Sequence, residues 1–243
     1  MPARFYVPDL DPARGVAHLP ADEAHHLVKV LRLETGAIVG VFDGRGCEWR
    51  ARVVTADRNG VEVSLLEPVS MRAPVTDLTL VQAVLKGQAM DDVIRDCTMV
   101  GVTAIQPVLT ARTTVKTSAM QAARDRWRRV ALASAKQCGA ARLPQIDDVV
   151  SFGDWIDGSP VQPAFILVEP SVGAAALTMR RVASQPVPAR ATLVVGPEGG
   201  WTEEERDRAV SCGCSPLSLG PLILRADAVP LAAAAALLAI WGE

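Results

Sequence analysis

The chain has 243 residues, of which 49% are hydrophobic and 21% charged, and its formal net charge is −2. These values are typical of a soluble globular protein with a substantial core. The start of the chain lacks the apolar run of a signal peptide, and the longest apolar run, 231–241, is too short to span a bilayer. The five cysteines are scattered and the three histidines all lie within the first 26 residues. We therefore expect free thiols, a cytoplasmic protein, no membrane partner and no metal site.

The first 68 residues predict a small β-rich domain with one helix. Apolar or alternating runs separated by turn signals such as Asp43-Gly44 are typical of short strands. These strands are expected at 4–7, 37–42, 48–55 and 60–66. The helix is expected at 21–31, with Leu27, Val30 and Leu31 on one side. Because 67–74 holds two prolines, we expect two domains, 1–70 and 74–243.

After Pro74 the pattern changes to apolar strands that alternate with helices. Strands are expected at 78–84, 104–109, 164–168, 192–195 and 217–219. Helices are expected at 91–100, 119–137, 174–183, 202–211 and 228–241. Thr202 followed by Glu205 is a capping box at the start of the fourth of these helices. This alternation predicts an α/β fold with a parallel sheet covered on both faces.

A basic segment lies within this second part of the chain. Between 110 and 145 there are eight basic residues against a single acid, Asp125. The basic residues are Arg112, Lys116, Arg124, Arg126, Arg128, Arg129, Lys136 and Arg142. Such a concentration in a mildly acidic chain indicates a phosphate-rich partner, although a solvated helix face is the alternative interpretation.

The segment 194–202 is the first candidate for a ligand site. A buried strand runs into a turn with glycines at Gly196, Gly199 and Gly200 and then into the capped helix. Glycines let backbone N–H groups approach a ligand closely, and ligands of parallel sheets bind beyond the carboxyl ends of the strands. The turn does not match the phosphate-loop pattern, because no Gly-Lys-Ser/Thr follows it. A plain connection between strand and helix is the alternative.

The second candidate is the loop after the last expected strand, 217–228. It is unusually apolar for a connection, so its leucines could line a slot for a planar ring. Asp227 is well placed to cap the final helix, which is the structural alternative to a chemical role. Arg225 lies just before it, and its alternative is an ordinary surface arginine.

With these segments in place, the chain resembles the RsmE-type 16S ribosomal RNA (uracil-N3)-methyltransferases of the SPOUT superfamily. The resemblance rests on 193–202 and 218–229, on 4–7, 23–36 and 127–144 upstream, and on the Val30-Leu31-Arg32-Leu33 motif followed by Gly36. It implies a PUA-like β-barrel domain that binds RNA at 1–70. It further implies a SPOUT methyltransferase domain at 74–243 with a C-terminal trefoil knot, and a homodimer packed through that domain.

The same resemblance implies the cofactor, the partner and the site residues. The cofactor is S-adenosyl-L-methionine, and the partner is 16S rRNA of the small ribosomal subunit, methylated at N3 of a uridine. The implied cofactor-binding residues are Leu167, Val168, Glu169, Gly196, Pro197, Glu198, Gly199, Gly200, Leu219, Gly220, Leu222 and Leu224. The implied RNA-binding residues are Arg4, Arg32, Lys86, Arg112, Arg124 and Arg128.

The chemistry of the reaction suggests roles for two more residues. Uracil N3 must lose a proton, and a guanidinium near the imide oxygens would stabilise the negative charge, so Arg225 is the first candidate. Asp227 is the candidate proton acceptor. In this chain 224–229 reads Leu-Arg-Ala-Asp-Ala-Val where the family usually has Leu-Arg-Thr-Glu-Thr-Ala. A non-catalytic RNA-binding protein, or an enzyme with another RNA target, therefore stays open as an alternative.

Overall fold

The computed structural model describes residues 2–57, 60–70, 74–115, 120–170 and 176–242. Internal contacts divide the chain into two units, Met1–Ala73 with Ala135–Leu143, and Pro74–Ser134 with Pro144–Glu243. The expected division at 70–74 stays a prediction. The contacts add the segment Ala135–Leu143 to the first unit, which reasoning along the chain did not anticipate.

The first unit is built on a five-stranded sheet in the order β1-β3-β4-β5-β2. Its strands are β1 (Arg4–Tyr6), β2 (Val16–His18), β3 (Ile38–Phe42), β4 (Glu48–Asp57) and β5 (Gly60–Pro68). β1 and β3 are parallel, and the remaining pairs are antiparallel. Two register shifts between β4 and β5 curl the sheet around an apolar core. The four expected strands are confirmed, whereas β2 was missed because three residues carry too little pattern.

The expected helix at 21–31 consists of two segments. The α-helix α1 (Ala21–His25) continues as the π-helical turn η2 (His26–Val30), and the short 3₁₀ helix η1 (Pro12–Arg14) precedes both. Leu27 is fully buried in the core of the unit, whereas Val30 and Leu31 are exposed. The prediction that these three side chains lie on one side of the helix is therefore wrong, because it assumed the period of an α-helix, whereas His26–Val30 is a π-helical turn.

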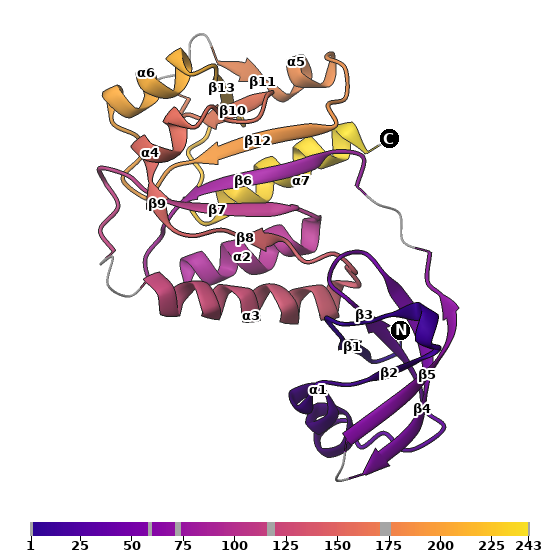
Figure 1. Cartoon of the computed structure of the whole chain (residues 1–243). Helices are drawn as coiled ribbons and strands as arrows, with labels where there is room; N and C mark the ends of the chain where they lie inside the picture. The colour runs from indigo at the N-terminus through magenta and orange to yellow at the C-terminus, as the bar shows by residue number, and fades with distance from the viewer. Residues whose placement is uncertain (1, 58–59, 71–73, 116–119, 171–175, 243) are drawn as a thin grey trace. The chain divides into compact units, whose positions relative to one another are not determined.

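The second unit contains an eight-stranded sheet in which every pairing is parallel. Its order is β11-β13-β10-β12-β6-β7-β8, with β9 paired to β7. The strands are β6 (Asp77–Ala83), β7 (Ala104–Leu109), β8 (Gln145–Ile146), β9 (Val150–Ser151), β10 (Ala164–Leu167), β11 (Leu177–Thr178), β12 (Arg190–Val195) and β13 (Ser215–Ser218). The parallel sheet predicted from the sequence is confirmed (Figure 1).

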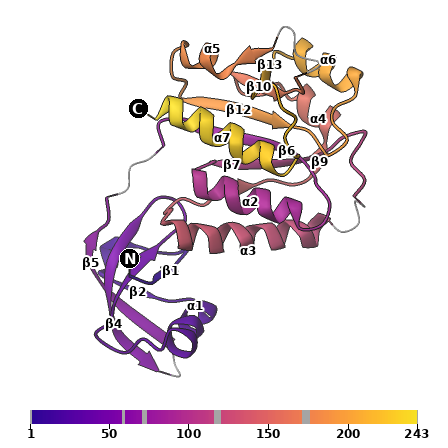
Figure 2. The same cartoon turned by 180° about the vertical axis from the view of Figure 1, so that it is seen from behind.

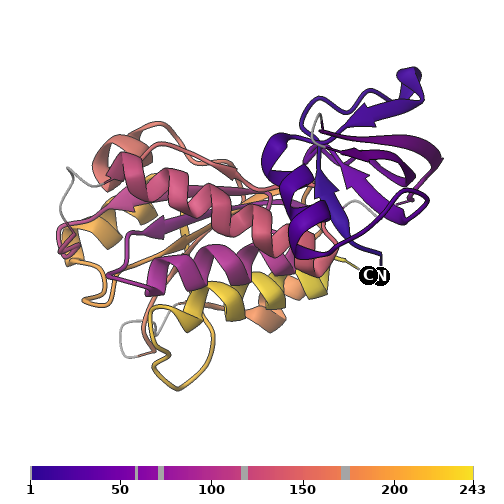
Figure 3. The ribbon, with the colours of Figure 1, turned by 90° about the horizontal axis from the view of Figure 1, so that it is seen from below.

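Helices cover both faces of this sheet, as alternate residues of β6 show. Leu78 and Leu80 pack against α2 (Ala89–Val100), α3 (Met120–Cys138) and α7 (Ala228–Trp241). Val81 and Ala83 pack against α4 (Phe152–Asp157) and α6 (Glu203–Ser211) on the opposite face. Figures 2 and 3 show α2 and α7 side by side along the sheet. Two apolar faces therefore hold the parallel strands between two helical layers.

Most expected helices of this unit are confirmed, with one correction. A single helix was expected at 174–183, but the structure has the strand β11 followed by α5 (Met179–Ala183), while 174 and 175 lie outside the described residues. Position 119, expected to begin α3, also lies outside them. The capping box of Thr202 and Glu205 is present at the start of α6. No helix within the described residues is both long and apolar enough to cross a membrane.

Candidate functional site

Three neighbouring strands of the parallel sheet end beside one another. β10 pairs with β12 on one side and with β13 on the other, so the loops that follow all three leave the same edge. A cavity of about 280 Å³ lies at this edge. The residues that line it are Arg112, Leu167, Val168, Glu169, Pro170, Val195, Gly196, Pro197, Glu198, Gly200, Trp201, Arg206, Ser218, Leu219, Gly220, Leu222, Ile223, Leu224, Ala226 and Val229. The structure thus brings together eleven of the twelve residues expected to bind the cofactor, and the twelfth, Gly199, adjoins the lining.

The loop after β12 is a tight turn that depends on its glycines. The Gly200 N–H donates to the Pro197 carbonyl at 2.9 Å, and Gly200 has a φ of +69°, a conformation that favours glycine. A Cβ at Gly196 would lie 3.1 Å from the Trp201 indole. A side chain at either position would therefore displace the wall of the cavity.

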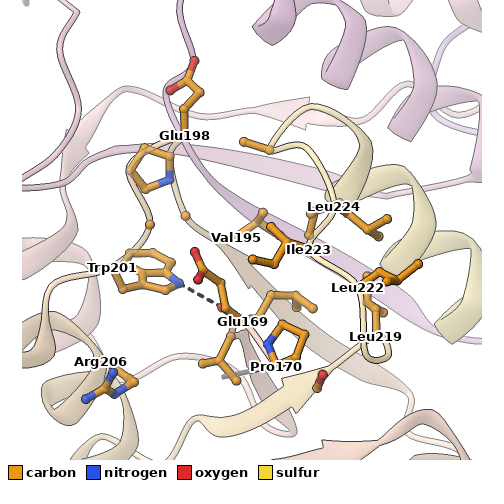
Figure 4. Close-up of a pocket in the computed structure, with 18 of the residues that line it drawn as sticks. Glu169, Pro170, Val195, Glu198, Trp201, Arg206, Leu219, Leu222, Ile223 and Leu224 are labelled. Carbon is orange, nitrogen blue, oxygen red and sulfur yellow. Dashed lines mark hydrogen bonds between the residues drawn. The ribbon is translucent and has the colours of Figure 1, made fainter. Parts of the chain in front are cut away.

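Trp201 joins two of the three loops. Its Nε1–H donates to the Leu167 carbonyl at the end of β10, at 3.0 Å, and its ring packs against Phe152 at a centroid distance of 4.9 Å. Figure 4 shows this hydrogen bond at the cavity wall. Trp201 falls within the segment 194–202 that was expected to form a ligand site, but no role was predicted for its side chain. The only available signal was a large aromatic residue directly after a glycine turn.

The loop after β13 supplies an apolar wall, as its composition predicted. Leu222 and Ile223 are 76% and 72% exposed, and Leu224 is also exposed, although all three line the cavity. Figure 4 shows these three side chains on the side of the cavity away from Trp201 and Glu198. Burying this much apolar surface would be favourable, so the loop is suited to contact a bound molecule or a partner.

Arg225 and Asp227 form an ion pair beside this wall. Arg225 Nε and Nη2 donate to the two carboxylate oxygens of Asp227 at 3.1 and 2.8 Å. These hydrogen bonds hold the pKa of the Asp227 carboxyl below its usual value and raise the pKa of Arg225. The interpretation of Asp227 as a side-chain cap is wrong, because it occupies the N-cap position of α7 without a capping hydrogen bond. Its carboxylate binds the guanidinium instead.

Both positively and negatively charged side chains line the cavity. The Arg112 guanidinium donates to the Gly199 carbonyl at 2.7 Å, which places a residue expected to bind RNA against the glycine turn. Glu198 accepts a hydrogen bond from the backbone N–H of Lys86 at 3.1 Å. Glu169 and Arg206 add one carboxylate and one further guanidinium. Arg206 was missed by the sequence analysis, because it lies on a helix outside the motif.

Two of the expected RNA-binding arginines are engaged within the protein. Arg4 has a 5% exposed side chain and pairs with the buried Glu48 at 2.6 Å, and it also donates to the carbonyls of Ala135 and Ala140 in the same unit. Arg124 is largely buried and forms an ion pair with Asp148. The Arg4 guanidinium is enclosed by its own acceptors, which favours a structural role over the expected role in RNA binding.

The other candidates are open to solvent. Arg32, Lys86 and Arg112 are exposed, and Arg128 is exposed with its nearest carboxylate, that of Asp125, at 3.8 Å. Arg124 and Arg128 were expected to share one helix face, but only Arg128 presents its charge at the surface. Lys116 of the basic segment lies outside the described residues. Among the described residues there is no cluster of three side chains suited to a metal ion.

Comparison with known proteins matches each part of the chain to a family of RNA methyltransferase domains. Residues 71–238 match the model of an RNA methyltransferase domain, and residues 19–66 match that of an RNA methyltransferase PUA domain. Two relatives that are similar in sequence are both named ribosomal RNA small subunit methyltransferase E. The one from Synechocystis is 36% identical over 89% of this chain and 71% of its own length, and the one from Mycobacterium bovis 30% identical over 98% and 92%.

One solved structure is similar to this chain in both fold and sequence. The crystal structure of a ribosomal RNA small subunit methyltransferase E from Neisseria gonorrhoeae, bound to S-adenosyl methionine, matches with a TM-score of 0.89. It is 30% identical and covers 100% of this chain and 98% of its own. The similarity thus extends over both units.

Proposed function

This chain belongs to the RNA methyltransferase family that includes the ribosomal RNA small subunit methyltransferases E, and on that premise we propose that it methylates a uridine at N3 in 16S rRNA with S-adenosyl-L-methionine as the methyl donor. The observation that carries the proposal is the cavity at the ends of β10, β12 and β13, where the expected cofactor residues meet. The relative solved with S-adenosyl methionine has the same fold over the whole chain.

The cavity has the properties that this cofactor requires. The glycine turn at 196–200 lets backbone groups approach the bound cofactor closely. The apolar loop after β13, with Leu219, Leu222 and Leu224, offers a surface for the adenine ring. The methionine end of the cofactor carries both a carboxylate and an ammonium group. Arg206 and Glu169 both line the cavity and would supply a guanidinium for the carboxylate and a carboxylate for the ammonium group, although Arg206 also lies 3.7 Å from Glu203 and from Asp207.

The residues beside the cavity suit the transfer of a methyl group to an imide nitrogen. When bound, the cofactor supplies an activated methyl group. Arg225 would stabilise the negative charge that develops on the uracil oxygens as the N3 proton leaves. Asp227 holds the Arg225 guanidinium through two hydrogen bonds, which lower the pKa of its carboxyl and keep it ionised. The same bonds weaken the carboxylate as a base, so its first role in the proposal is to orient Arg225, and proton acceptance is its second.

The remaining expectations enter the proposal as follows. The exposed cations Arg32, Lys86 and Arg128 would contact phosphates, which position RNA without reading its sequence. A homodimer packed through the second unit is also part of the proposal. We also propose the trefoil knot for the C-terminal part, and a cytoplasmic location, with which five free cysteines agree.

Calorimetric titration with S-adenosyl-L-methionine tests the cofactor site. Gly200→Val should abolish binding, because valine does not tolerate the φ of +69° at the turn. Gly101→Val is the matched control, since Gly101 has a φ of +96° at the end of α2 with no atom near its Cβ position. The control should lose stability but keep the cofactor. Equal affinity in folded Gly200→Val and wild type would remove this turn from the site.

A further inference from the structure

The end of the first unit's helix has an unusual geometry. The π-helical turn η2 closes with Leu31 N–H donating to the His26 carbonyl at 3.0 Å, followed by Leu33 N–H donating to the Leu27 carbonyl at 3.1 Å. Leu27 is fully buried, and Leu33 packs against the same core. These two leucines fix the chain on either side of Val30, Leu31 and Arg32, which are exposed. π turns are rare and occur frequently at functional sites.

Arg32 lies in the left-handed region, with a φ of +53°. Helix ends commonly place glycine in this conformation, because a side chain is strained there. A residue that carries a long cationic side chain at such a position gives up backbone stability. That loss suggests that the side chain has a use outside the fold.

The segment Lys29–Arg32, which we call the tip, presents two apolar side chains between two cations. Val30 is 58% and Leu31 40% exposed, and Lys29 and Arg32 are both exposed. Neither cation has a carboxylate within ion-pair distance among the residues that the structure describes, although the exposed Glu34 follows two positions later. An adjacent pair of exposed apolar side chains flanked by free positive charge fits a ligand that is both planar and anionic.

We propose that the tip packs Val30 and Leu31 against an unstacked nucleobase of the RNA, while Lys29 and Arg32 hold the flanking phosphates. The inference rests on the proposed function, because it assumes an RNA substrate. Sequence-specific RNA recognition mostly targets single-stranded loops with splayed bases. Apolar side chains, leucine among them, are known to pack against base faces when proteins open the base steps of DNA. The tip lies within the part of the chain that matches the RNA methyltransferase PUA model.

The two halves of the tip predict different salt dependence. Apolar contacts with a base release no counterions, whereas each lost phosphate contact lowers the salt slope by about 0.7 for single-stranded RNA. Leu31→Ala should therefore weaken binding about fivefold at every salt concentration, from the apolar area it removes. Arg32→Gly should weaken binding and flatten the slope. It should also raise or preserve the melting temperature, because glycine relieves the left-handed strain.

Fluorescence anisotropy with labelled 16S rRNA fragments, measured from low to high salt, tests the proposal. Val54→Ala is the matched control, since Val54 is an exposed valine on β4 of the same unit, and it should bind like the wild type. Unchanged affinity in Leu31→Ala, or the same loss in Val54→Ala, overturns the proposal. Loss of self-association in Leu31→Ala by light scattering also overturns it, in favour of a contact between copies. Wild-type protein that fails to bind RNA at all would refute the proposed function itself.

Discussion

Replacing Trp201 with Phe should loosen the cofactor site while the fold is kept. The Trp201 side chain hydrogen-bonds the loop after β12 to the end of β10, through Nε1–H to the Leu167 carbonyl at 3.0 Å. Phenylalanine keeps the aromatic contact with Phe152 but has no donor. The loop after β12 would then lose this side-chain hydrogen bond to the end of β10, although the pairing of β10 with β12 in the sheet is kept.

The expected change in cofactor affinity follows from the loss of a single, partly buried hydrogen bond. Such a bond contributes about 0.5–1.5 kcal/mol, which corresponds to about a 2- to 12-fold change in an equilibrium constant. We expect the Kd for S-adenosyl-L-methionine to rise by about fivefold, measured by calorimetry. Trp155→Phe is the control, because Trp155 packs against the same Phe152 but is not among the residues that line the cavity. An equal rise in both variants, or none in Trp201→Phe, would refute the reasoning.

Three further predictions concern rate, stability and reactivity. Arg225→Ala should lower the methylation rate by about 10²–10³ with little change in cofactor affinity, and Arg225→Lys should restore only part of it; a near-normal rate would remove Arg225 from the chemistry. Arg4→Ala leaves the buried Glu48 carboxylate unpaired and should lower the free energy of unfolding in urea by about 3–5 kcal/mol, whereas a loss of RNA affinity at full stability would contradict the structural role. Burial raises the pKa of the Cys97 thiol from 9.0 to about 12, so at pH 8 its thiolate fraction is roughly 10³ lower than usual. Thiol reagents should therefore label Cys97 far more slowly than the half-buried Cys47, with a rate that rises as the pH approaches 12, and mass spectrometry of labelled peptides checks this.

The longer strands and helices of the second unit could be predicted from local pattern, because β6, β10 and β12 are almost wholly buried apolar runs. β8, β9 and β11 were missed as strands, because two residues each carry too little pattern. Thr202 and Glu205 are three residues apart, so the capping box is visible in the sequence and is present in the structure. The glycine turn at 196–200 was recognised for the same reason. α4 was missed because six residues are too short for periodicity, although Ser151 caps it through the Asp154 N–H.

Interactions between distant segments could not be predicted in this way. Arg4 and Glu48 are 44 positions apart, and no local rule pairs them, so the ion pair was not predicted and Arg4 was assigned to RNA binding from the resemblance. Asp227 lies where a capping residue belongs, yet its rotamer turns toward Arg225, a choice that depends on the fold of the loop. The role of Trp201 depends on the register between β10 and β12, which places Ile166 beside Val194. Register is a tertiary property that composition and periodicity do not contain.

The most direct test of the account is to incubate the purified chain with unmodified 16S rRNA and S-adenosyl-L-methionine carrying a labelled methyl group. Nuclease digestion and mass spectrometry then locate the label. The account predicts one labelled nucleoside, a uridine methylated on N3, and loss of the label in Arg225→Ala. Label on another base or on a ribose hydroxyl, or no transfer despite bound cofactor, would contradict it.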